Sequence, residues 1–266
     1  MTQNTEWQTA SEPAEWTWDE PDPGWHSPCR RLEATGLTSP LDRAELAGIG
    51  VTGIQFGSWD GRDPGCLNTD VIGLVAGDTR TEPGHVYRVD GGAYFVRLDA
   101  RDPLPLADGC LDWAYAEHFI EHLTLAEGIG WLREVRRILA VGGWLRLTTP
   151  DLHRYVAGYL DDGADGFFAR HRRRLMSLGA KPEDLPERKA FMVNQIFQFH
   201  GHKWIYDLDE LRHALGAAGF DPDAISVRAF GRSALPHLAA LDRAVRNDET
   251  IYVDVRRTVT TGPQDR

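Results

Sequence analysis

The sequence predicts an α/β fold in which a mostly parallel sheet carries helices on both faces. Short apolar runs of strand length recur between residues 51 and 147, and an amphipathic helical pattern separates the last two. Parallel neighbours need long crossover connections, which are usually helices. The chain has 266 residues, 42% of them hydrophobic and 26% charged, which is typical of one large globular domain.

The first half of the chain is expected to supply four strands. Each is a short apolar run, bounded in most cases by turn residues. The four runs are residues 51–56, 71–75, 94–98 and 111–116. In an open parallel sheet, ligands bind at the carboxyl ends of the strands. Residues that directly follow these runs are therefore the candidates for a functional site.

Helices and three more strands are expected in the second half. Apolar residues recur at spacings of three and four in Leu125–Leu139, and two glycines follow this helical pattern. A fifth strand is expected at residues 144–147. Residues 207–218 predict another helix, with Asp207 as its N-cap and Gly219 after its end. The closing strands are expected at residues 225–229 and 251–255.

Three further segments differ from the sheet region in composition. Residues 1–47 are expected to form an acidic arm, because the first 29 residues hold four Trp and six carboxylates but no Lys or Arg. We expect the arm to cover apolar surface of its own chain, with a contact to a partner protein, a lid over the substrate or a homo-oligomer contact as the alternatives. Residues 48–258 form the main domain, in which 151–205 are too long for a plain connection and predict a helical, aromatic cap. Residues 259–266 are expected to be a disordered tail.

Charge and cysteine content argue against several classes of protein. The sum of 29 Lys and Arg against 40 Asp and Glu gives a net charge of −11, which repels phosphate backbones and anionic lipid. We therefore expect neither nucleic acid nor a membrane as a partner. Three cysteines without CxxC spacing indicate free thiols in a reducing compartment. No apolar run spans a membrane and no signal-peptide pattern is present, so a cytoplasmic location is expected.

A glycine and two carboxylates accompany the first three predicted strands. Gly57 follows the first strand, where a missing Cβ lets the backbone approach a ligand closely. Asp70 lies in the second strand region, where a carboxylate can accept hydrogen bonds from both hydroxyls of a ribose. Asp99 follows the third strand and suits an adenine amino group. Three such positions in register are a more specific signal than any one of them.

With these motifs the chain resembles the class I S-adenosylmethionine-dependent methyltransferases, in particular the small-molecule type with an abbreviated first glycine motif. The resemblance depends on the order of several short motifs, each of which is common by itself. The matching segments are 56–58, 67–70, 98–100, 104–106, 111–123, 132–135, 142–146, 149–152, 202–204, 219–220 and 251–253.

The resemblance implies a Rossmann-like, seven-stranded sheet that binds S-adenosylmethionine across the ends of its first four strands. It implies an enzyme that methylates an oxygen or nitrogen atom of a small molecule, in secondary metabolism such as antibiotic biosynthesis. The expected cofactor-binding residues are Gly57, Ser58, Asp60, Asp70, Asp99, Ala100, Ala116 and Glu117.

Histidines are the candidate proton acceptors, because a neutral imidazole with a pKa near 6.5 can take the proton of a hydroxyl or ammonium acceptor. His118, near a strand end, and His202, in the cap, are the predicted catalytic residues. A hydrogen bond that fixes the cap loop is the alternative role of His202. The predicted substrate-binding residues are His200, Trp204 and Tyr206.

Two other functions are kept as alternatives. His118–His122 matches the H-x-x-E-H pattern, in which two histidines on one helix face bind zinc and the glutamate acts as a base. The methyltransferase motifs already account for this segment, so we assign no metal ligands. Trp59 stands where such enzymes usually have a second glycine, and together with the Trp-rich arm it motivates a non-catalytic, methyltransferase-like binding protein.

Overall fold

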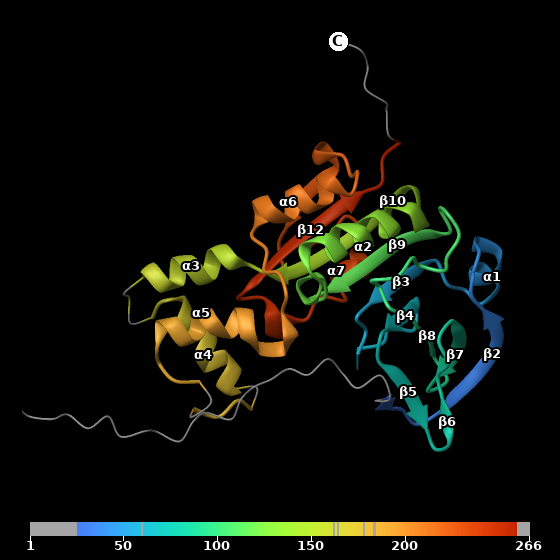
Figure 1. Ribbon diagram of the computed structural model, residues 1–266, viewed down its shortest axis with the longest axis horizontal. Helices are drawn as coiled ribbons and strands as arrows, with labels where there is room; N and C mark the ends of the chain where they lie inside the picture. The colour runs from blue at the N-terminus through green and yellow to red at the C-terminus, as the bar shows by residue number, and fades with distance from the viewer. Residues whose placement is uncertain are drawn as a thin grey trace, which may run out of the picture.

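The computed structural model describes residues 26–59, 61–161, 163, 165–177, 179–182 and 185–259. In this part of the chain a twisted sheet forms the centre of the molecule, and a group of helices, α3 to α5, lies beyond one end of it (Figure 1). Shorter strands and a single helix, α1, surround the opposite end. No helix in the described ranges is long and apolar enough to cross a membrane.

The main sheet has nine strands in the order β11-β12-β10-β9-β3-β4-β8-β7-β2. The five from β10 to β8 are parallel, whereas β12 runs antiparallel to both of its neighbours and β7 to both of its own. The fold class is thus confirmed, with β7 and β2 added beyond the seven predicted strands. The bounds are β2 Leu32–Thr38, β3 Gly53–Phe56, β4 Leu67–Asp70, β7 His85–Val89, β8 Ala93–Arg97, β9 Leu111–Glu117, β10 Leu139–Pro150, β11 Ile225–Arg228 and β12 Thr250–Arg256.

The connections after β3 and β4 differ from the prediction of helices on both faces. Residues 57–66 join β3 to β4 as a loop, without a helix among those described. Between β4 and β8 the chain forms strands instead: β5 (Gly73–Ala76) and β6 (Thr79–Arg80) pair with β1 (His26–Pro28) in a separate three-stranded sheet. The strand predicted at 71–75 is therefore wrong, because most of that run belongs to β5 and the main sheet uses β4.

Residues 26–47 of the predicted arm take part in both sheets. β1 pairs with β5, β2 pairs with β7, and α1 (Arg43–Gly48) begins at Asp42, whose side chain accepts a hydrogen bond from the backbone N–H of Glu45. Residues 1–25, which hold the four arm tryptophans, and residues 260–266 of the predicted tail lie outside the described residues.

Helices α2 (Leu125–Ile138) and α6 (Leu208–Ala217) lie side by side along one face of the sheet (Figure 1). A capping box between Thr124 and Glu127 begins α2, and its buried stripe includes Trp131 and Leu132. Both predicted helices are confirmed within one residue at each end. The glycines after α2 act differently from the prediction, since Gly142, with φ of +87°, lies in β10 where its register against β9 shifts.

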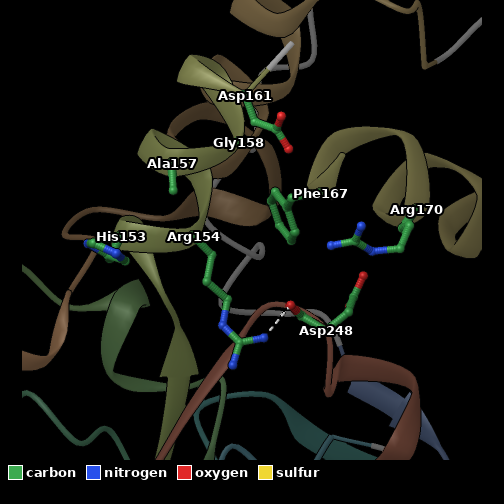
Figure 2. A pocket seen from close by; sticks show the side chains of 8 residues that line it. All are labelled: His153, Arg154, Ala157, Gly158, Asp161, Phe167, Arg170 and Asp248. Atoms are coloured by element: carbon green, nitrogen blue, oxygen red, sulfur yellow. Dashed lines mark hydrogen bonds between the residues drawn. The ribbon is translucent and has the colours of Figure 1, made fainter. Parts of the chain in front are cut away.

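The predicted cap region contains α3 (Leu152–Leu160), α4 (Phe167–Ser177) and α5 (Lys189–Gln198). These helices share a small apolar core of their own, apart from the core of the sheet; its buried members are Tyr155, Phe168, Met192, Ile196 and Ile205. A hollow of about 350 Å³ opens between α3, α4 and the loop before β12, where the side chains of Arg154, Arg170 and Asp248 face one another (Figure 2).

A substitution at Gly53 tests the packing of β3 on β9. A Cβ at Gly53 would lie 2.1 Å from two atoms of the buried Trp113 indole. Gly53→Ala therefore has to displace the indole or the strand, and we expect a loss of about 1–3 kcal/mol in the free energy of unfolding. Urea denaturation should show a lower midpoint with an unchanged slope.

Gly130→Ala is the matched control for this prediction. Gly130 lies inside α2, and a Cβ built there meets no atom within 4 Å. Because alanine is the better helix former, stability should rise by up to about 1 kcal/mol. Equal losses at the two positions would contradict the role assigned to the Trp113 indole.

Candidate active site

The carboxyl ends of β3, β4, β8 and β9 lie next to one another. Phe56, the last residue of β3, is in register with Thr69 of β4 on one side and with Ala116 of β9 on the other. Asp70 is in register with Arg97 of β8. The residues predicted to bind the cofactor are thus brought to one edge of the sheet, apart from Asp60, which lies outside the described residues.

The loop after β3 bends sharply back toward Asp70. Gly57 has φ of +60°, and a Cβ on it would lie 2.8 Å from the Phe119 ring, so conformation and packing both require glycine there. Trp59 also has a positive φ, of +40°, and its indole is 43% exposed. The backbone N–H of Trp59 donates to Oδ2 of Asp70, and that of Ile72 donates to Oδ1, each at 3.0 Å.

The residues of this loop fit an adenosyl cofactor. Burial raises the pKa of Asp70, and its carboxylate also accepts a hydrogen bond from the backbone of Val71, so three backbone donors leave part of its acceptor capacity open. Ser58 is buried, and its hydroxyl has no hydrogen-bond partner among the described residues. An orphaned hydroxyl beside an anchored carboxylate is suited to a ligand with hydroxyl and charged groups.

Asp99 and Ala100 follow β8 and are both half-buried. The Asp99 carboxylate accepts hydrogen bonds from Nε and Nη2 of Arg101 at 3.0 and 2.7 Å, and this bonding lowers its pKa. An adenine amino group at Asp99 would therefore meet a carboxylate that is already held in place by Arg101. Ala116 is fully buried in β9.

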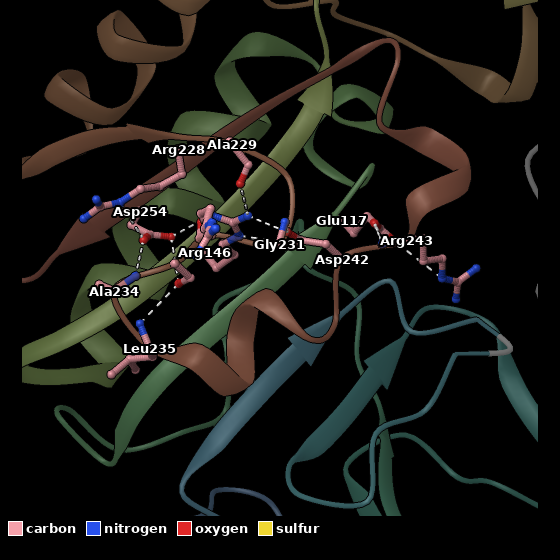
Figure 3. A network of polar contacts seen from close by, with 12 residues as sticks. Glu117, Arg146, Arg228, Ala229, Gly231, Ala234, Leu235, Asp242, Arg243 and Asp254 are labelled. Atoms are coloured by element: carbon pink, nitrogen blue, oxygen red, sulfur yellow. Dashed lines mark hydrogen bonds and ion pairs between the residues drawn. The ribbon is translucent and has the colours of Figure 1, made fainter.

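Glu117, at the end of β9, is held by a loop from the far end of the chain. Its Oε1 accepts the backbone N–H of Arg243 at 2.8 Å, and its Oε2 lies 3.3 Å from Nε of Arg243. Burial raises the pKa of Glu117. The preceding residue, Asp242, pairs with the buried Arg146 of β10, whose Nη2 donates to Oδ2 of Asp242 at 2.5 Å (Figure 3).

The polar network around Arg146 was not predicted from the sequence. Arg146 also donates to Oδ1 of Asp254 in β12 at 3.0 Å (Figure 3). A further hydrogen bond goes to the carbonyl oxygen of Arg232 at 2.9 Å. Its only sequence signal is a charged residue inside each of two apolar strands, Leu145-Arg146-Leu147 and Val253-Asp254-Val255. The network joins β10, β12 and the loop that holds Glu117.

His118 lies directly after β9 with φ of +48°, and its side chain is only 4% exposed. Nε2 lies 2.7 Å from Oγ1 of Thr250, whose hydroxyl donates to the carbonyl oxygen of Arg246. Because that hydroxyl proton is already used, Nε2 is the donor and Nδ1 keeps its lone pair. Nδ1 is 3.4 Å from Oε1 of Glu121. Burial lowers the pKa of His118 well below its usual value, so the ring is neutral.

The H-x-x-E-H segment does not form the helix that a zinc peptidase requires. His118 has a left-handed backbone conformation, and Ile120–His122 is a single 3-10 turn. The two histidines therefore do not share a helix face. Glu121 is fully buried, which raises its pKa to about 8, and its Oε2 accepts the hydroxyl proton of Thr149 at 3.1 Å.

The loop after α5 is joined to the 3-10 turn Ile120–His122 by backbone hydrogen bonds. The N–H groups of Lys203 and Trp204 donate to the carbonyl oxygen of Glu121 at 2.7 and 3.2 Å. His202 is thereby placed against His122, with ring centroids 5.0 Å apart. Nδ1 of His202 lies 2.6 Å from the carbonyl oxygen of Ile196, and burial lowers its pKa to about 4.

The three predicted substrate-binding residues separate in the structure. His200 is exposed and has φ of +62°, and Trp204 is 40% exposed, with Nε1 donating to Glu210 at 3.0 Å. Tyr206 instead lies fully buried in the core of the sheet, beside Gly128. Packing against α2 thus removes Tyr206 from the surface at which a substrate could bind.

The chain is similar to known proteins in one segment of its sequence and in its fold. Residues 74–147 match the family described as a methyltransferase domain. No protein with a curated description matches the chain. A methyltransferase structure from Mesorhizobium loti is 18% identical with a TM-score of 0.43, covering 80% of this chain and 96% of its own. A possible histamine N-methyltransferase from Thermotoga maritima is 15% identical with a TM-score of 0.41, covering 77% and 81%.

Residues 74–147 are thus similar to a methyltransferase domain, and the sheet to which they contribute strands is the mostly parallel one that the sequence predicts.

Proposed function

We propose that the chain is an S-adenosylmethionine-dependent methyltransferase, EC 2.1.1.-, which methylates an oxygen or nitrogen atom of a small molecule in secondary metabolism; the methyltransferase-domain match of residues 74–147 supports the reaction class. The observation that supports the proposal is the contact of His202, from the cap, with His122 on the turn that follows β9, with ring centroids 5.0 Å apart. A proton-accepting group thus lies next to the strand end at which the cofactor is proposed to bind. The net charge of −11 favours a small acceptor over a nucleic acid.

The cofactor site is proposed to consist of Gly57, Ser58, Asp70, Glu117 and the segment 99–100, with the backbone at Ala116. When bound, S-adenosylmethionine supplies a methyl group already activated by its sulfonium. The protein then has to align the acceptor and receive its proton. Asp70 would accept the ribose hydroxyls with the lone pairs that its backbone donors leave open. Glu117, held by Arg243, sets the position of the β9 end beside the reacting groups.

Of the two predicted catalytic histidines, His202 is proposed to receive the proton. Its Nδ1 carries the hydrogen donated to Ile196, so Nε2 presents a lone pair. The lowered pKa keeps this ring neutral at cytoplasmic pH. His118 bonds to Thr250 and is almost fully buried, so its proposed role is to position the turn that carries Glu121 and His122.

His202→Ala is expected to lower turnover by about 10²–10⁴-fold while leaving the affinity for S-adenosylmethionine unchanged, because it removes a proton acceptor and no cofactor contact. The measurement is kcat on the identified acceptor together with calorimetry of the cofactor. His213→Ala, an exposed histidine of α6, is the control and should change neither. A parallel loss of cofactor binding in His202→Ala would show that the residue only holds the cap.

Transfer of label tests the proposed function itself. Full-length enzyme is incubated with methyl-labelled S-adenosylmethionine and, in separate reactions, with small-molecule, RNA and protein fractions of cells that contain the gene naturally. Label is expected in the small-molecule fraction. Label in RNA or protein alone would refute the proposed acceptor class. Cofactor binding without transfer to any fraction would instead favour the non-catalytic binding protein.

A further inference from the structure

Glu121, His122 and His202 form a cluster with the composition of a metal site. Each offers one potential ligand atom, and the three atoms lie within 4.8 Å of one another. The cluster joins the 3-10 turn after β9 to the loop that follows α5, which are far apart in the sequence. Glu121 is fully buried and the two histidines are half-buried. Two of the three potential ligands, Glu121 and His122, thus come from the H-x-x-E-H segment, and the third, His202, comes from the cap.

The hydrogen bonds of the two imidazoles leave lone pairs without donors. Nδ1 of His202 donates to the carbonyl oxygen of Ile196 at 2.6 Å, and the ring of His122 donates to the carbonyl oxygen of His200. Each neutral ring therefore keeps one nitrogen as an acceptor. Oε1 of Glu121 has no hydrogen-bond partner among the described residues. The Thr149 hydroxyl donates to Oε2 of Glu121, so the acceptor positions that remain open are Oε1 and one nitrogen of each imidazole.

Ring N–H groups held by backbone carbonyls are typical of metal-ligating histidines, because the bond fixes the tautomer and orients the free nitrogen. Two imidazoles and one carboxylate are a ligand set that zinc accepts with a fourth position open. We infer that Glu121, His122 and His202 bind one divalent metal ion of the zinc class. Zinc ligands lie about 3.4 Å apart in a tetrahedral site, so small side-chain rotations would close the cluster.

The charges around the cluster partly offset one another. Arg246 and Glu249 both act on His202 and Glu121 with opposite signs. His118, His200 and Tyr206 are further titratable neighbours, and burial keeps His118 neutral. A zinc ion on the Glu121 carboxylate would leave one positive charge, which an anionic fourth ligand could balance.

A second cluster of similar composition, formed by His171, Asp248 and Glu249, differs because its ligand atoms are already paired with one another and with an arginine. In His171, Asp248 and Glu249, the histidine Nδ1 is 3.0 Å from Asp248, and Arg174 lies 2.7 and 3.0 Å from the two carboxylates. Tyr155 donates to Glu249 at 2.5 Å. A guanidinium already supplies the positive charge there, so this cluster holds the cap to the loop before β12.

Zinc titration of the full-length protein tests the inference. Protein stripped with a chelator is titrated with Zn²⁺, and bound metal is counted after dialysis. The wild-type chain should retain one zinc ion. A cobalt-substituted sample should show the visible absorption of a four-coordinate, tetrahedral site. His122→Ala and His202→Ala should lose the ion. Glu121→Gln, which keeps the shape of the side chain, should weaken binding by about 100-fold or more.

His213→Ala is the matched control and should bind zinc as the wild type does. Circular dichroism and calorimetry with S-adenosylhomocysteine on the same samples report whether each variant is folded. Absence of zinc from folded wild-type protein, or equal zinc in the wild type and the cluster variants, would overturn the inference. Zinc on Nε2 of His202 would occupy the lone pair to which the proposed function assigns the proton, so the inference describes a metal-bound form and the labelling experiment is run on metal-free enzyme. Failure of methyl transfer there would leave the zinc count unchanged.

Discussion

Asp70→Ala is expected to weaken the binding of S-adenosylmethionine by about 100-fold or more. The carboxylate holds the loop after β3 through the N–H groups of Trp59 and Ile72, and it is proposed to accept the ribose hydroxyls. Each hydrogen bond to a charged group contributes about 1.5–3 kcal/mol, and every 1.4 kcal/mol is about tenfold in affinity. Loss of two such bonds therefore accounts for the expected change.

Calorimetry with S-adenosylmethionine and with S-adenosylhomocysteine measures this effect. Asp102→Ala is the control, since Asp102 is exposed on the loop after β8 and only one strand away. Asp70→Asn should give an intermediate loss, because one amide oxygen can still accept a backbone N–H. Unchanged affinity in folded Asp70→Ala protein would mean that the ribose does not lie at this strand end.

Arg146→Met is expected to lower the free energy of unfolding by about 3–5 kcal/mol. Arg146 has no exposed surface and pairs with Asp242 and Asp254, which are also buried. Methionine fills much of the same volume but leaves two carboxylates in the interior without their common partner. The penalty arises because Asp242 loses its ion-pair partner and Asp254 keeps only Arg228, whose side chain is 36% exposed.

Urea denaturation at neutral pH measures this loss. Arg228→Ala is the matched control, because Arg228 pairs with the same Asp254 at 3.0 Å but its side chain is 36% exposed. That exposed pair should contribute less than about 1 kcal/mol. Similar losses in the two variants would contradict the assignment of the stability to the buried charges. Replacing Arg146, Asp242 and Asp254 together with apolar residues should restore part of the loss.

Strong periodic patterns in the sequence predicted their elements well. The stripe of α2 and the cap of α6 gave bounds within one residue of those observed. β4 was missed because three of its four residues are polar. Asn68 and Thr69 are nevertheless buried, and the Asn68 side chain donates hydrogen bonds to the backbone carbonyls of Asp63 and Tyr94. Local apolarity favoured 71–75 instead, which belongs to the small sheet.

The candidate site could be predicted from the sequence only where the backbone forms regular strands, and not where it takes a left-handed conformation or a 3-10 turn. Gly57 and Asp70 reach one edge because parallel strands end together. The H-x-x-E-H spacing predicts His118 and His122 on one face of a helix. In the structure the positive φ of His118 and a single 3-10 turn place them apart. Such a conformation depends on tertiary hydrogen bonds to Thr250, more than one hundred residues later. Tyr206 was misplaced for a related reason, since nothing local shows that its ring packs against α2.

The place of β12 affects the order in which the chain can fold during synthesis. β12 lies between β10 and β11, yet it is made last of the strands. Until residues 250–256 leave the ribosome, β10 offers an unpaired edge to other chains, and Arg146 faces no Asp254. The sheet therefore stays incompletely paired until β12 has been synthesised. Slow translation of residues 250–256 would prolong the period in which the nascent protein needs protection from aggregation.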